Sequence, residues 1–106
     1  MSMPPLKALN APLLALRVFS VEFAHLSAPC LSVSTVYPDL LELSFHDDLG
    51  GFEAWRDALG LTPESVSYHE QGTHTRVLTA ETDYAGARLR LTGYGRIPAL
   101  TQGRAS

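Results

Sequence analysis

The sequence is poor in cysteine and in uninterrupted apolar segments. Its single cysteine, Cys30, cannot form a disulfide within the chain and has no second cysteine with which to build a zinc site. The apolar stretch after Lys7 is interrupted by Arg17 and Glu22, well short of the roughly 18 apolar residues of a membrane-spanning helix. Pro29 stands directly before Cys30, where a lipoprotein cleavage site requires a small residue. We therefore expect a cytoplasmic protein that is neither exported nor bound to a membrane.

Lysine, isoleucine and asparagine each occur once, whereas alanine, leucine and glycine are plentiful. Codons rich in G and C encode the abundant residues, so the composition indicates a high-GC bacterium. A length of 106 residues with 45% hydrophobic residues predicts one soluble, folded domain. We expect this domain to cover residues 1–97, with a flexible segment over residues 1–8, and a flexible tail over residues 98–106.

Residues 9–26 fit two secondary structures. Spacings of three and four residues would place six apolar side chains on one side of a helix. They are Leu9, Leu13, Leu16, Phe19, Phe23 and Leu26. Val18 and Val21 would lie on the opposite side, and residues 17–23 also alternate as a strand would. Both structures stay open, and a helix that is apolar on two sides would predict a partner, such as the second copy of a homodimer.

Turn residues divide the rest of the chain into short elements. Phe52, Trp55 and Leu59 share one stripe of a helix expected over residues 51–60, which Gly60 ends. Alternating apolar residues predict strands over residues 31–36, 40–46, 65–71, 74–82 and 87–94. The sequence thus predicts an α+β fold in the order α-β-β-α-β-β-β, with helices on one face of a mainly antiparallel sheet and the other face open.

Two segments, Ser34-Thr-Val-Tyr-Pro-Asp-Leu-Leu-Glu-Leu-Ser-Phe-His-Asp-Asp-Leu and Phe52-Glu-Ala-Trp-Arg-Asp-Ala-Leu, give the middle two thirds of the chain a family resemblance. This part resembles small uncharacterised proteins of actinobacteria and their mobile elements. The resemblance implies a cytoplasmic accessory protein and supplies no site residues.

Acidic and basic residues are segregated along the chain. Residues 39–83 hold ten acidic residues and two arginines, whereas residues 84–106 hold four arginines and no acid. Alternation along residues 87–94 would place Arg88, Arg90, Thr92 and Tyr94 on the open face, where they could bind a protein partner. Alternatively, the acids of the preceding hairpin pair with Arg88 and Arg90 within the fold.

Histidines and carboxylates offer a weaker candidate site. His46, Asp48 and His69 could stand at the mouth of a pocket between the helix over residues 51–60 and the sheet. Their spacing matches no zinc motif, and no serine or cysteine lies in an activating sequence, so we expect no metal, cofactor or catalytic residue. Gly93 and Gly95 precede no helix, which excludes a phosphate loop, and we expect them to kink a strand end.

The sequence therefore favours a non-enzymatic protein-interaction or regulatory module that acts through an open sheet face. The alternative is a small-molecule-binding domain or enzyme that uses the pocket beside residues 51–60. A third class is an acidic mimic of DNA or a nucleic-acid binder. The mimic has support in the ten acids against two arginines of residues 39–83, although apolar core residues dilute these charges, whereas the net charge of −3 and the single lysine do not favour nucleic-acid binding.

Overall fold

The computed structural model describes residues 3–97, so the tail expected over residues 98–106 and the first two residues of the expected flexible segment lie outside the described part. A 3₁₀ turn at Leu6–Leu9 leads into helix α1, Asn10–Glu22. Of the two structures that residues 9–26 fit, the helix is the one found, but it ends at Glu22, and residues 23–26 form a turn. Pro12, Ala15 and Phe19 are buried, and they hold α1 against the sheet.

Helix α2, Leu49–Ala58, has clear start and stop signals. Asp48 is its N-cap, and Oδ1 of Asp48 accepts a hydrogen bond of 3.0 Å from the Gly51 N–H. Gly60 follows the helix with φ of 78°, a conformation that glycine adopts without strain. Trp55 is 4% exposed, and its Nε1–H donates to the Ser27 carbonyl at 2.8 Å, which ties α2 to the segment after α1.

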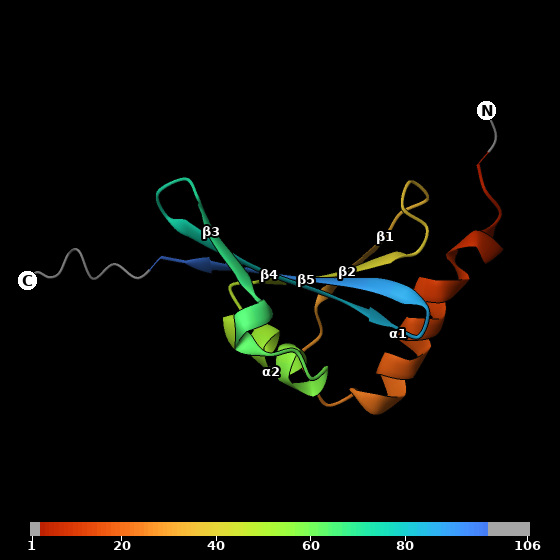
Figure 1. The fold of residues 1–106 in the computed structure, drawn as a ribbon, viewed down its shortest axis with the longest axis horizontal. Helices are drawn as coiled ribbons and strands as arrows, with labels where there is room; N and C mark the ends of the chain where they lie inside the picture. The colour runs from red at the N-terminus through yellow and green to blue at the C-terminus, as the bar shows by residue number, and fades with distance from the viewer. Residues whose placement is uncertain (1–2, 98–106) are drawn as a thin grey trace, which may run out of the picture.

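Within residues 3–97, five strands form one sheet in the order β1-β2-β5-β4-β3 (Figure 1). Their bounds are Cys30–Val33 for β1, Leu40–His46 for β2, Ser67–Gln71 for β3, Thr75–Tyr84 for β4 and Ala87–Arg96 for β5, with a short 3₁₀ turn at Pro63–Ser65 before β3. β1 is shorter than expected because Oγ of Ser34 accepts a bond of 3.0 Å from the Val36 N–H, which turns the chain.

The sheet is mixed, so the expectation of a mainly antiparallel sheet was wrong at its centre. β5 pairs in parallel with β2 on one side and antiparallel with β4 on the other. The cause is the connection after β2, which runs through α2 to the far edge, so that the last hairpin brings β5 back beside β2. An α+β fold with both helices on one face of the sheet is as expected (Figure 1).

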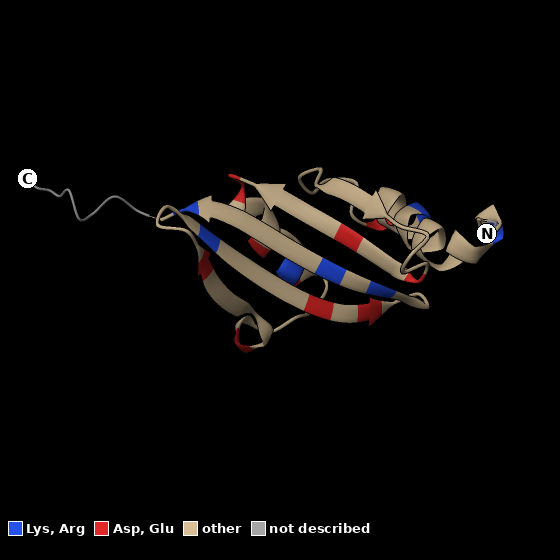
Figure 2. Cartoon of the chain, turned by 90° about the horizontal axis from the view of Figure 1, so that it is seen from above, with Lys and Arg blue, Asp and Glu red and all other residues tan. Residues whose placement is uncertain are grey.

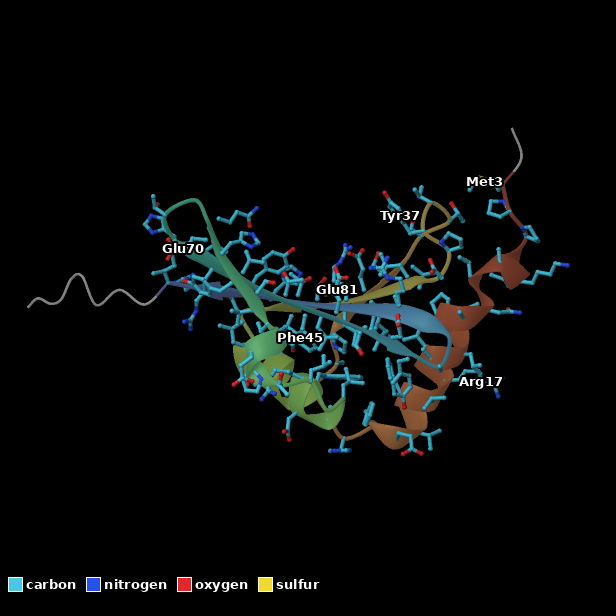
Figure 3. All side chains as sticks on the ribbon, viewed as in Figure 1. Met3, Arg17, Tyr37, Phe45, Glu70 and Glu81 are labelled. Carbon is cyan, nitrogen blue, oxygen red and sulfur yellow. The ribbon has the colours of Figure 1, made fainter. Side chains whose placement is uncertain are left out.

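The core lies between the helices and one sheet face. Phe45 points toward the helix layer, whereas Glu81 points to the opposite side (Figure 3). Gly93 and Gly95 are also buried on the helix side, where α2 approaches β5 closely. A Cβ built on Gly95 would lie 2.5 Å from Cδ1 of Leu49, and one on Gly93 would lie 2.9 Å from Cδ2 of the same residue. These glycines therefore admit the helix rather than kink the strand.

Candidate binding face

The sheet face opposite the helices, here called the open face, has no helix over it in residues 3–97. The β3–β4 hairpin and the loop joining β1 to β2 rise on this side, so the face is concave (Figure 1). Strand register places its side chains in rows that run across the strands. We call them the ionic row (Glu81, Arg90 and Glu42), the hydroxyl row (Ser67, Thr79, Thr92 and Ser44) and the aromatic row (His69, Val77, Tyr94 and His46).

The ionic row links three strands through Arg90. Its Nε donates to Glu81 on β4 at 3.0 Å, and one terminal nitrogen donates to Glu42 on β2 at 2.9 Å. The neighbouring Arg88 also contacts Glu81, at 3.0 Å. The hydrogen bond to Glu81 is the main cause that raises the pKa of Arg90 above its ordinary value. Figure 2 shows these basic positions on β5 between acidic positions on β2 and β4.

The ion pairs change the interpretation of Arg88, Arg90, Thr92 and Tyr94. All four residues expected to bind a partner lie on the open face of β5, at alternate positions from Arg88 to Tyr94. However, the charges of Arg88 and Arg90 are balanced by Glu42 and Glu81, so this part of the face is ionic without being basic. The intramolecular pairing that the sequence left open is the arrangement found.

The hydroxyl row forms the floor of a shallow trough. Thr79, Thr92 and Ser44 are half-buried and adjacent across three strands, and their short side chains lie between the taller ionic and aromatic rows. The side-chain hydrogen bonds that serine and threonine make within residues 3–97 lie elsewhere, at Ser20, Ser34 and Ser65. The trough hydroxyls are thus free to bind a ligand. A hollow of about 350 Å³ covers this region, with Thr79, Thr92, Glu42 and His69 in its lining.

The aromatic row begins and ends with histidine. The rings of His46 and Tyr94 stack with centroids 4.9 Å apart and planes 8° from parallel. Val77, between Tyr94 and His69, is 4% exposed although it lies on the open face, so the row covers a small apolar patch. A second hollow, of about 270 Å³, adjoins His46 and Tyr94 at the end of β2 and β5, where Asp47 takes a positive φ of 57°.

The three residues of the alternative pocket are not brought together. His46 and His69 stand on the open face, separated by Val77 and Tyr94. Asp48 instead caps α2 in the helix layer. The space expected to hold that pocket is filled by apolar rings, because Phe45, Phe52 and Trp55 pack together between α2 and the sheet.

Glu42, Glu81, Ser44 and Thr79 belong to the face but were not singled out from the sequence. Strand alternation alone would have assigned them to it, since Glu42, Ser44 and Thr79 lie between apolar neighbours and Glu81 is two residues after Thr79 on the same strand. Nothing local in the sequence indicates which strand lies beside which, so their rows could not be found.

Within residues 3–97, no three His, Cys, Asp or Glu side chains gather closely enough to hold a metal ion. No helix in the same range combines the length and the apolar character needed to cross a membrane.

Comparisons of the chain with protein-family models, with curated proteins and with solved structures found no significant match.

Proposed function

We propose that this chain is a non-enzymatic protein-interaction module, a cytoplasmic accessory or regulatory protein that binds its partner on the open face. The observation that supports the proposal is the trough, a row of unpartnered hydroxyls between an ionic row and an aromatic row on a concave sheet. Interfaces between proteins combine such hydrogen-bonding groups with aromatic and arginine side chains. Tyr94, Arg90 and Thr92 supply all three kinds of group from a single strand.

The charge pattern favours a protein partner over nucleic acid. Binding to phosphates relies on cations that are free to neutralise them, and Arg88 and Arg90 already contact carboxylates. The same pairs involve Glu42 and Glu81, which lowers the support for an acidic mimic of DNA. A protein partner needs no net charge on this face, only groups that match its own donors and acceptors.

The test blocks the trough without touching the core. Thr92→Arg places a long side chain in the middle of the hydroxyl row, and Thr62→Arg makes the same change at an exposed position outside the sheet. We expect both variants to melt within a few degrees of the wild type, because half-buried and exposed positions tolerate such changes. A partner captured from the native host, then purified, should bind the wild type and Thr62→Arg but not Thr92→Arg. Equal affinity for Thr92→Arg would refute the proposal.

A second candidate is a small-molecule-binding domain, with the ligand on the open face instead of beside α2. The hollow over the trough favours it, because about 350 Å³ falls within the range of roughly 300–1,000 Å³ that ligand sites occupy. Protein purified from its host would be denatured, and mass spectrometry of the small molecules released would reveal a bound compound. A compound present in the wild type and lost in Thr92→Arg would support this candidate over the first.

Self-association is a further part of the proposal. The homodimer expected from residues 9–26 draws on the apolar residues that α1 leaves exposed, Leu14 at 51% and Val21 at 75%. Arg17 lies between them on the exposed side of the helix and interrupts this apolar surface. α1 alone therefore offers an apolar surface in two parts. If the chain forms a dimer, a more continuous apolar surface should lie elsewhere on the fold.

A further inference from the structure

The two edge strands of the sheet, β1 and β3, differ in how they are protected. An exposed edge presents unpaired N–H and C=O groups, and proteins commonly block it with charged residues, prolines or bulges. β3 carries Glu70 beside His69. β1 holds neither a charged residue nor a proline, and the wider segment over residues 30–38 contains no charge at all. Of the usual protections, the described residues give β1 a short length, of four residues.

Apolar side chains are exposed in and beside β1. Leu31 is 51% exposed, and Val36 and Tyr37 in the loop that follows are 73% and 63% exposed. Figure 3 places Tyr37 in that loop. On the helix side, a hollow of about 200 Å³ lies against Leu31 and is lined by Phe23, Leu26 and other apolar residues. The edge thus adjoins an apolar hollow on the helix side, which residues of α1 and α2 line in part.

We propose that β1 binds β1 of a second copy of this chain, so that two sheets join into one across a twofold axis. The inference rests on the self-association proposed above and moves its site from α1 to the sheet edge. Backbone hydrogen bonds between the two strands would satisfy the outer groups of β1, and the contact would remove Leu31 of both copies from water.

The absence of charge at the β1 edge indicates which strand can pair with it. Antiparallel pairing about a twofold axis sets each strand against its own sequence, so a charged residue near the axis meets its own copy and is repelled. Residues 30–38 are free of that penalty, whereas Glu70 would impose it on β3. A neutral edge also offers nothing to select a charged partner strand. A second copy therefore fits β1 better than it fits β3.

The alternation of β1 restricts the register. Cys30 and Ser32 lie on the open face, whereas Leu31 and Val33 lie on the helix side. If the helices of both copies stay on one side of the joined sheet, opposed residues must share a face, and the axis must pass through Leu31 or through Ser32. With the axis through Ser32, this residue lies directly opposite Ser32 of the second copy. With the axis through Leu31, the two Ser32 residues lie diagonally across the strand pair, within reach of a long side chain.

Ser32→Lys tests the edge, with Ser67→Lys as its matched control. Both serines are exposed on the open face of an edge strand, one on β1 and the other on β3. Light scattering at high micromolar concentration should give twice the monomer mass for the wild type and Ser67→Lys, and the monomer mass for Ser32→Lys. Circular dichroism should show all three folded, since the changed positions are exposed.

Cysteine cross-linking gives the register independently. In a Cys30→Ser background, Ser32→Cys or Leu31→Cys places the only thiol at one of the two allowed axis positions. We expect rapid disulfide-linked dimer on mild oxidation of one of these variants, and little from a thiol placed at Ser67.

Several results would overturn the proposal. A monomeric wild type would refute self-association altogether. A dimer that survives Ser32→Lys but dissociates in Val21→Lys would place the contact on α1 and refute the edge alone. Neither result bears on partner capture, which Thr92→Arg tests at a separate surface.

Discussion

Replacement of Gly95 by alanine tests the packing that positions the aromatic row. The new methyl group would lie 2.5 Å from Cδ1 and 3.0 Å from Cγ of Leu49, both closer than carbon atoms can approach without a shift. The backbone of Gly95 is not in the positive-φ region, so alanine meets no conformational strain and would on its own stabilise the strand by about 0.5 kcal/mol. Any loss of stability therefore reports the contact with Leu49.

Overpacking of a well-filled site costs about 1–3 kcal/mol. Leu49 is half-buried and can give way partly, so we expect Gly95→Ala to lower the free energy of unfolding by about 1–2 kcal/mol. Leu49→Ala alone should cost about 2 kcal/mol, the low end for a leucine that packs against a core. In the double variant the new methyl group at position 95 no longer meets the Leu49 side chain. Its loss in the free energy of unfolding should therefore be smaller than the sum of the two single losses by about 1 kcal/mol.

Urea denaturation of the wild type, the two single variants and the double variant gives all four free energies under one condition. Gly86→Ala is a useful comparison, because a Cβ there meets no atom within 4 Å but the residue has φ of 85°. It should lose about 1 kcal/mol through backbone strain and show no coupling with Leu49. A Gly95→Ala variant as stable as the wild type, or a double variant whose loss is simply additive, would refute the close-packing argument.

Three further predictions concern stability and are checked by the same denaturation. Trp55→Ala should cost about 3–5 kcal/mol, because this buried ring packs edge-on against Phe19, whereas Trp55→Phe should cost less. Asp48→Ala should cost about 1 kcal/mol by removing the α2 cap, and Asp48→Ser should restore most of it. Arg90→Glu should cost about 1 kcal/mol in low salt and less in high salt, because it sets three partly exposed carboxylates together. The control Arg17→Glu should change the stability little. Equal effects of the two variants would contradict the ionic row.

The elements that were predicted correctly depend on signals that lie close together in the sequence. The capping aspartate, the stripe through Phe52 and Trp55, and the stop at Gly60 are all close in sequence, and α2 was placed within two residues at each end. Alternation gave β2 with its observed bounds for the same reason. Such signals show which side of a strand is buried. They do not show which strand is its neighbour.

The errors lie where distant segments meet. Glu42 and Arg90 are 48 residues apart, and their ion pair exists because β5 returns to the centre of the sheet in parallel with β2. The same return put Gly95 against Leu49, which gave the glycines a packing role in place of a kink. The pocket assigned to His46 and Asp48 failed because consecutive short elements turned these side chains into different layers.

The late position of β5 in the chain has a consequence for folding. β5 is the last strand in the sequence of the described residues, yet it lies third in the sheet, between β2 and β4. Until it is in place, α1 with the first two strands and the β3–β4 hairpin have no strand to join them. During synthesis the sheet can therefore close only after residue 96 has left the ribosome, and a chain truncated before Ala87 would hold two separate fragments. Pairings across long stretches of sequence form slowly, so the rate-limiting event should be the insertion of β5 between the two halves.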